Sequence, residues 1–404
     1  MKQQQRKSRP LICLLLLTVF LLFGGCAGSF PEAAEGPEAA NPDDSSPEIS
    51  GSENAAQQPT TEEAGQQLRF ICMEYDRDRL VQELIEQNPE QNISLSLLPR
   101  EVIERRQPYA EMLREELRRD DLGVLILNPA LLNTYSQALS ETAELAPEVP
   151  RVVCDPGTLS PQILEQADLL LQWDYTAQVR RMMEIAVNDM QATALVYYTY
   201  SRFRDDPDFS GVYRTGFDTA EQVCGELGID FVPVVIPDEL GADAYFILDR
   251  DIPQKVEEYG VNTAFYSDGW NMQTMLYAKA LELGAIVASP GIPESQLSFL
   301  REENATATYS DAEIALRKQL QEKEVNGRLA DFPVDGGWLE TQAIAAYCQK
   351  WLDGELSPGE IDLPTMEKIL EELCGGDCYL HYYEQDGVTY ENCLLYSLEP
   401  IIIK

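Results

Sequence analysis

Residues 122–127 read Leu-Gly-Val-Leu-Ile-Leu, an apolar run without alternation that is typical of a strand buried on both faces. A helical period follows over 133–145, and two further strand-like runs follow at 151–154 and 168–172. Strands that alternate with helices in this way form mostly parallel sheets with helices on both sides. The stretch therefore predicts an α/β fold.

The same alternation continues in both directions from this stretch. Toward the N-terminus it predicts strands at 69–75 and 92–98 and helices at 79–86 and 109–119. Toward the C-terminus, a long helix at 175–191 opens a second series. That series predicts strands at 194–198, 231–236, 263–266 and 285–288, helices at 218–227, 252–259, 272–283, 313–324 and 339–352, and a hairpin at 379–383 and 389–395. The whole pattern predicts two doubly wound parallel-sheet domains.

The N-terminus carries an export signal. Four basic residues precede the apolar run at 11–23, and the sequence Gly24-Gly-Cys26 follows it. This order resembles a bacterial lipobox, which implies that Cys26 is lipidated and anchors the protein to membrane lipid. An uncleaved anchor helix is the alternative. Residues 27–67 hold nine acidic residues, no Lys or Arg, and five Pro, a composition that cannot build a core.

We predict five segments from these patterns. They are a lipoprotein signal peptide at 1–25, an acidic disordered tether at 26–67, an N-terminal α/β domain at 68–174, a C-terminal α/β domain at 175–335, and a return segment of helices and a hairpin at 336–404 that completes the N-terminal domain.

Several motifs resemble a known family. They are Leu170-Leu-Gln-Trp-Asp174, Thr263-Ala-Phe-Tyr-Ser-Asp268, Gly327-Arg-Leu-Ala-Asp-Phe-Pro333 and Gly387-Val-Thr-Tyr-Glu-Asn-Cys393. With these, residues 68–404 resemble the bacterial lipoproteins of domain of unknown function 3798. Two successive α/β units also resemble the type 1 periplasmic-binding-protein fold, which implies hinged domains with a small ligand between them. The resemblance implies no particular ligand.

Composition excludes several functions. The chain has 30 Lys and Arg against 69 Asp and Glu, a net charge of -39, which would repel nucleic acid. Its one histidine, His381, argues against His-based metal sites and most catalytic triads. The phosphate-loop, dinucleotide-binding and nucleophile-elbow motifs are missing from the sequence. We therefore expect no enzyme activity, no metal and no cofactor.

The cysteines leave three alternatives open. Without Cys13 of the signal and Cys26, seven remain, an odd number that cannot pair completely within one chain. Unpaired thiols, a disulfide between Cys374 and Cys378, and a metal site at that pair are the alternatives, with unpaired thiols favoured.

Ligands of open α/β sheets bind beyond the carboxyl ends of the strands, so strand-end residues are the candidates. The predicted ligand-binding residues are Asn128, Trp173, Asp174, Tyr200, Arg202, Asp268 and Trp270. Asp155 and Ser289 end two further strands. Five of the seven predicted residues also have a structural interpretation: helix capping for Asp174 and Asp268, core packing for Trp173 and Trp270, and a surface ion pair for Arg202.

These observations predict a membrane-anchored extracytoplasmic lipoprotein that binds a small solute in an interdomain cleft, for transport or sensing. Its expected partners are the solute, membrane lipid through Cys26, and a membrane transporter or sensor, but no nucleic acid. A non-binding envelope scaffold that recognises another protein is the alternative, and an enzyme on the same scaffold is a weaker one.

Overall fold

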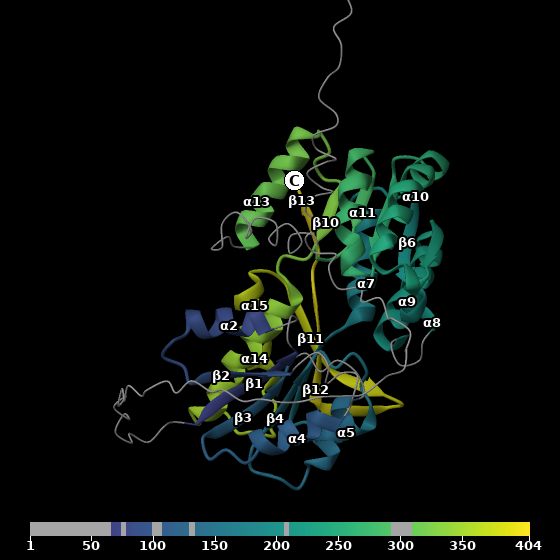
Figure 1. The fold of residues 1–404 in the computed structure, drawn as a ribbon. Helices are drawn as coiled ribbons and strands as arrows, with labels where there is room; N and C mark the ends of the chain where they lie inside the picture. Colours follow the sequence, from purple (N-terminus) through teal and green to yellow (C-terminus); the bar gives the residue numbers. More distant parts are fainter. Residues whose placement is uncertain (1–65, 74–77, 99–106, 129–133, 206–209, 292–308) are drawn as a thin grey trace, which may run out of the picture. The chain divides into compact units, whose positions relative to one another are not determined.

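The computed structural model describes residues 66–73, 78–98, 107–128, 134–205, 210–291 and 309–404 (Figure 1). The predicted signal peptide, Cys26 and nearly all of the predicted tether lie outside these residues. The first strand, β1 (Gln67–Met73), begins at the last residue predicted for the tether.

Seven strands form the first sheet, in the order β11-β12-β5-β4-β3-β1-β2. Strands β1 to β5 run parallel to one another. Their bounds are β2 (Ile93–Leu98), β3 (Leu122–Leu127), β4 (Arg151–Cys154) and β5 (Leu169–Trp173). The hairpin of β11 (Cys378–Gln385) and β12 (Val388–Leu398) joins this sheet, because β12 pairs in parallel with β5.

Six strands form the second sheet, in the order β13-β10-β9-β8-β6-β7. The bounds are β6 (Ala194–Tyr200), β7 (Asp230–Ile236), β8 (Thr263–Ser267), β9 (Ile286–Ala288), β10 (Leu329–Asp331) and β13 (Ile401–Ile403). Among the described strands of this sheet, only β13 is antiparallel to its neighbour. Because β13 lies in the return segment, that segment contributes strands to both sheets.

Helices connect and cover these strands (Figure 1). Those of the first series are α2 (Asp78–Gln87), α4 (Gln107–Glu116), α5 (Thr134–Glu141) and α6 (Pro161–Gln166). Those of the second are α7 (Tyr175–Asn188), α8 (Ser201–Asp205), α9 (Ser210–Leu227), the 3-10 helix η1 (Asp238–Asp243), α10 (Ala244–Tyr259), α11 (Trp270–Glu282) and α13 (Tyr309–Glu322). The return segment adds α14 (Gly336–Leu352) and α15 (Leu363–Cys374). No described helix has both the length and the apolarity needed to cross a membrane.

Both sheets share one strand order. The first five strands of the first sheet follow the order 2-1-3-4-5, and β7-β6-β8-β9-β10 repeats that order in the second. In such sheets, strands are added first on one side of the first strand and then on the other. Ligands bind beyond the carboxyl ends of the strands, near the point where the side changes. The predicted α/β class with two doubly wound sheets is confirmed, with antiparallel strands added at the edges. Strands β10 and β13 and helices α6 and α15 were not predicted.

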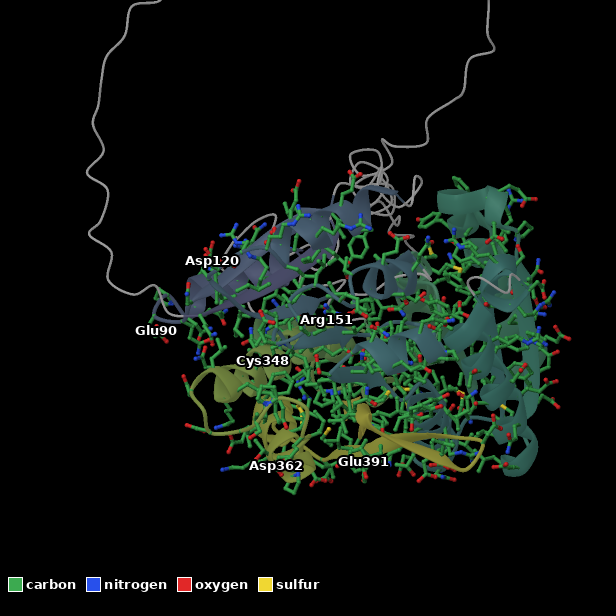
Figure 2. The ribbon with its side chains drawn as sticks, turned by 90° about the horizontal axis from the view of Figure 1, so that it is seen from below. Glu90, Asp120, Arg151, Cys348, Asp362 and Glu391 are labelled. Carbon is green, nitrogen blue, oxygen red and sulfur yellow. The ribbon has the colours of Figure 1, made fainter. Side chains whose placement is uncertain are left out.

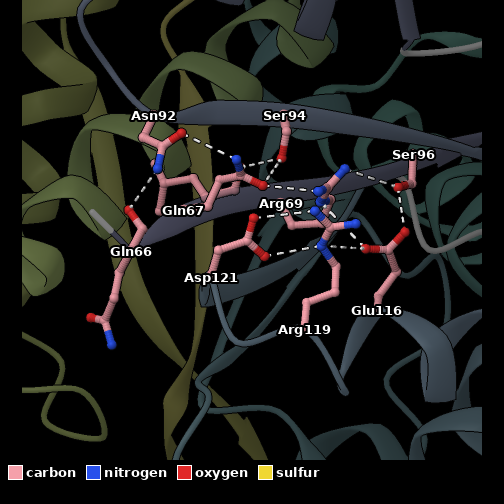
Figure 3. Close-up of polar contacts among 10 residues, drawn as sticks. Gln66, Gln67, Arg69, Asn92, Ser94, Ser96, Glu116, Arg119 and Asp121 are labelled. Carbon is pink, nitrogen blue, oxygen red and sulfur yellow. Dashed lines mark hydrogen bonds and ion pairs between the residues drawn. The ribbon is translucent and has the colours of Figure 1, made fainter. Parts of the chain in front are cut away.

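A polar network fastens the edge of the first sheet (Figure 3). Arg69 of β1 lies 3.4 Å from the Glu116 carboxylate, and both side chains are nearly buried, at 10% and 13% exposed. Arg69 also donates to Ser96 on β2, and the Ser96 hydroxyl donates to Glu116 at 2.6 Å. The network therefore ties β1, β2 and α4 together.

Backbone carbonyl groups hold the buried side chain of Arg151, the first residue of β4. The Arg151 guanidinium donates to the carbonyl oxygens of Thr142 at 2.9 Å and Leu145 at 2.7 Å, just after α5. Burial lowers its pKa. Figure 2 shows Glu90 and Glu391 at the periphery and Arg151 and Cys348 among packed side chains. The seven cysteines of the described residues are all buried, and no disulfide joins any two of them, as favoured above.

Candidate functional site

A cavity of about 230 Å³ is lined by residues of both sheets. Strand ends and the segments that follow them supply most of the lining, which is where the topology places a ligand site. The lining residues are Asp155, Trp173, Tyr175, Gln178, Val179, Tyr197, Tyr213, Gly216, Tyr266, Ser267, Asp268, Gln273, Pro290, Gly291, Asp331, Phe332, Val334, Asp335, Gly336 and Gly337.

The lining is aromatic and acidic. Six of these residues carry aromatic rings and four are aspartates, whereas none of the described lining residues is Lys, Arg or His. Aromatic rings provide area with little conformational freedom to lose, and carboxylates accept hydrogen bonds. The cavity is therefore suited to a molecule that donates hydrogen bonds and presents an apolar or cationic face.

Asp268 is the cavity aspartate whose carboxylate oxygens are buried without a hydrogen bond of good geometry. It directly follows β8. Burial raises its pKa to about 7, while the Thr199 and Tyr197 hydroxyls approach closely enough to offset part of that rise. A carboxyl that is buried without a firm partner costs folding free energy, which is the pattern expected of a ligand-binding group.

The other aspartates of the cavity are bonded within the protein. Asp335 caps α14 by accepting from the Trp338 amide at 2.7 Å. Asp331 accepts from the amides of Phe332 at 2.6 Å and Gly291 at 3.1 Å. Asp155 accepts from the Tyr175 hydroxyl at 3.4 Å. These bonds leave Asp268 as the carboxylate of the described lining most in need of a donor.

Two serines hold the backbone on either side of Asp268. The Ser267 amide donates to the Ser289 hydroxyl at 3.2 Å, and that hydroxyl donates back to the Ser267 carbonyl at 3.2 Å. The Gly269 amide donates to the Ser267 hydroxyl at 3.1 Å. Because the β8–α11 turn is fixed in this way, Asp268 is presented to the cavity by a rigid backbone.

Gln273, on the first turns of α11, adds a second unmet acceptor. Its amide nitrogen donates to the Ser267 carbonyl at 3.4 Å, which orients the side chain. Its oxygen is buried and lacks a hydrogen-bond partner. Asp268 and Gln273 thus bring to the cavity wall acceptor oxygens that a ligand with donors would satisfy.

Aromatic rings form two groups around the cavity. The Trp173 ring stacks on Tyr396 with centroids 4.6 Å apart and lies 5.6 Å from Phe332. Tyr197 stacks on Tyr266 at 4.8 Å. Burial, followed by the charge of Asp268, raises the pKa of both tyrosines, so their hydroxyls stay protonated at neutral pH.

Of the seven predicted ligand-binding residues, Trp173 and Asp268 line the cavity. For Asp268 the structure departs from the helix-cap interpretation, because the N-cap of α11 is Gly269, which forms no side-chain cap bond. Trp270 is the first residue of α11, and its side chain lies outside the described residues.

The other four predicted residues lie outside the described lining. Asp174 caps α7 by accepting from the Ala177 amide at 2.9 Å. Asn128 is buried and donates to the Thr341 hydroxyl at 2.8 Å. Tyr200 is buried in the core of the second sheet. Arg202 lies 3.6 Å from the Asp238 carboxylate on the exposed surface, in agreement with its surface ion-pair interpretation.

Sequence reasoning missed much of the site. Tyr197 and Tyr266 lie within strands, where an aromatic residue is expected to be core. The segment from Asp331 to Gly337 follows β10, a strand of three residues that the pattern did not predict. One available signal was that the segment contains an Asp-Gly-Gly sequence directly before a helix, typical of a capped turn.

The family model described as "Protein of unknown function (DUF3798)" matches residues 76–324, more than half of the chain. The chain belongs to this family. The DUF3798 assignment agrees with the resemblance stated from the motifs. No curated protein matches the chain.

Solved structures show the fold of this DUF3798 protein. A "Putative transcriptional regulator" from Clostridium difficile 630 aligns with a TM-score of 0.72 at 16% identity, over 84% of this chain and 99% of that one. A sugar ABC transport system substrate-binding protein from Bordetella parapertussis 12822 aligns with a TM-score of 0.51 at 10% identity, over 86% of this chain and 91% of that one. The fold is that of the type 1 periplasmic binding proteins.

Proposed function

We propose that this protein is an extracytoplasmic receptor that binds a small solute in the cavity between its two sheets, for transport or sensing. The observation that carries the proposal is the buried Asp268 carboxylate, which faces the cavity without a firm hydrogen-bond partner. A helix cap would explain such a residue, but Asp268 does not cap α11. A solute that donates hydrogen bonds explains it directly.

The fold supports solute binding in general and does not specify the solute. The similar protein from Bordetella parapertussis is described as a substrate-binding protein of a sugar transport system. The similar protein from Clostridium difficile is described as a regulator of transcription. The net charge of -39 disfavours a role on nucleic acid for this chain.

A screen for thermal stabilisation tests the proposal. A solute present at 100 times its Kd should raise the free energy of unfolding by about 2.7 kcal/mol. Asp268→Asn should remove most of that gain, because the substitution replaces one of the two acceptor oxygens with an amide nitrogen that can only donate. Asp249→Asn is the matched control, since Asp249 is half exposed and pairs with Lys279 on the surface. If no metabolite stabilises the parent protein, the scaffold alternative is favoured.

We also propose that Cys26 carries the lipid and that the acidic segment 27–65 spaces the folded residues from the membrane. The basic residues, apolar run and Gly-Gly-Cys order support this. Cys26→Ala should move the protein out of the membrane fraction and abolish labelling by a palmitate analogue. Cys13→Ala, within the apolar run, should change neither. Unchanged labelling of Cys26→Ala contradicts the anchor.

Binding without chemical conversion is the third part of the proposal. The sequence lacks the recognised catalytic motifs, and three of the four cavity aspartates are held by protein donors. Incubation of the stabilising solute with stoichiometric protein, followed by mass spectrometry, should return the solute unchanged. Recovery of a product would favour the enzyme alternative.

A further inference from the structure

We infer that the cavity selects a small organic cation, a protonated or quaternary amine, over neutral polyols and anions. The inference rests on the proposed solute-binding function and specifies the class of solute. Three independent features carry it: the unmet hydrogen-bonding groups, the charges around the cavity, and its aromatic rings.

The unmet polar groups are acceptors. Both Asp268 oxygens and the Gln273 side-chain oxygen are buried without a hydrogen-bond partner. Both residues line the cavity. A protonated amine offers only donors, so each hydrogen that it places here meets an acceptor. A quaternary amine has no N–H group and would pair with Asp268 through its charge. An anion, which offers acceptors, would leave these oxygens unpaired and add repulsion.

The charges favour a cation over a neutral polyol. Asp155, Asp268, Asp331 and Asp335 line the cavity, and no basic side chain of the described lining balances them. A neutral polyol can donate hydrogen bonds but leaves a buried charge uncompensated, whereas a cation compensates it. The receptor therefore gains selectivity from charge pairing as well as from hydrogen bonding.

The aromatic rings complete a site of this kind. Trp173, Tyr175, Tyr197, Tyr213, Tyr266 and Phe332 line the same cavity. The faces of aromatic rings carry negative electrostatic potential and attract cations. At about 230 Å³ the cavity is smaller than the roughly 300–1,000 Å³ of pockets for drug-sized ligands, so the cation that it selects is expected to be small.

Binding should depend on pH through Asp268. The titratable groups that face it are Tyr197 and Tyr266 from the second sheet, Tyr213 from α9, and the aspartates 155, 331 and 335. A cation favours the ionised carboxylate, whose pKa in the free protein is about 7. Affinity should therefore rise about tenfold between pH 6 and pH 8, as the ionised fraction rises.

The test compares each cation with a neutral compound of the same shape. Choline is paired with 3,3-dimethylbutan-1-ol, in which carbon replaces the charged nitrogen, and tyramine is paired with 4-propylphenol, in which a methyl group replaces the ammonium group. Putrescine, D-ribose and sulfate complete the set. Binding is measured by thermal shift and calorimetry with the parent protein, Asp268→Asn and the surface control Asp249→Asn.

We expect at least one cation to bind at least tenfold more tightly than its neutral partner. Asp268→Asn should remove this preference and its pH dependence, while Asp249→Asn keeps both. If D-ribose or a neutral partner binds as well as the cations, or sulfate binds best, the cation inference is wrong and the solute receptor stands. If none of the three cations binds, the cation inference is wrong, and the metabolite screen described above separately decides whether the protein is a solute receptor.

Discussion

At the scale of single residues, the ionisation of Asp268 affects both the proposed solute binding and the free energy of unfolding. Its carboxyl has a pKa of about 7 in the folded protein against 3.8 for an ordinary aspartate, because burial disfavours its charged form. Between these two values the folded protein retains a proton that the unfolded chain releases. The contribution of Asp268 to the free energy of unfolding therefore falls as pH rises from about 4 to 7 and is constant above that range.

Asp268→Asn should remove this pH dependence. At pH 8 the variant should be more stable than the parent by about 4 kcal/mol, at 1.36 kcal/mol for each unit of the pKa rise, and the two should be equal near pH 4. Urea unfolding of both proteins across this range, without added solute, measures the difference. A difference that does not vary with pH would show that the Asp268 carboxyl is solvated in the folded protein.

Gly336 is a position at which an added Cβ atom would disturb the packing. A Cβ at this position would overlap the Cζ2, Cε2 and Nε1 atoms of the Trp173 indole. Gly336→Ala should therefore lower the free energy of unfolding by about 2 kcal/mol or more, as overpacking does. Urea unfolding measures the loss.

Trp173→Leu removes the indole ring and its three overlapping atoms, so Trp173→Leu combined with Gly336→Ala should be more stable than the sum of the two single effects. Gly216→Ala is the control, because its nearest neighbour would be Val179 Cγ2 at 3.4 Å. That substitution should be neutral or stabilising in the middle of α9. Additive single effects would contradict the overlap at Gly336.

At the scale of elements, Asp268 can be compared with two other aspartates at helix starts, both of which cap their helices. Asp174 and Asp335 each accept a hydrogen bond from the amide three residues ahead, in α7 and α14. Asp268 precedes α11 but is one residue too early, since the helix has Gly269 as its N-cap. Because Asp268 lies one position before the N-cap, its carboxylate does not bond the amides of α11 and lines the cavity instead.

The polar network of β1, β2 and α4 is the element-scale contact most open to test. Glu116→Gln should lower the free energy of unfolding by about 3 kcal/mol, because it leaves the nearly buried Arg69 guanidinium without its ion-pair partner. Chemical unfolding measures the loss. Asp121→Asn, which breaks the more exposed pair with Arg119, should cost less than about 1 kcal/mol. Equal losses would show that Arg69 and Glu116 are solvated.

At the scale of the whole molecule, the folded residues should be independent of the acidic segment before them. Deletion of residues 27–65 should leave the thermal midpoint unchanged, because this segment has almost no apolar side chains with which to pack. Deletion of residues 27–70 should lower the midpoint strongly, since it also removes Leu68 and Phe70, both fully buried in β1. A fall of several degrees with the shorter deletion would show that the segment packs on the folded residues.

The sequence by itself determined the α/β class, the long strands and most helices of this protein. Strands such as 122–127 and 151–154 lie in the middle of parallel sheets, so both faces are apolar and the run is visible in the residues themselves. Asp268 and Trp173 could also be predicted, because each lies at or directly after the carboxyl end of such a strand. Ligands of open α/β sheets bind at those ends.

Only the tertiary structure decided which of these polar groups lack partners. Strands β10 and β13 have three residues each, too short for a pattern, and their pairing with neighbours makes them strands. The segment after β10 brings Asp331, Asp335 and Gly336 to the cavity from more than 60 residues beyond Asp268. Four aspartates look alike in the sequence. Hydrogen bonds from the surrounding backbone and side chains satisfy three of them, and burial without a firm donor distinguishes Asp268, because desolvation depends on every neighbour in space.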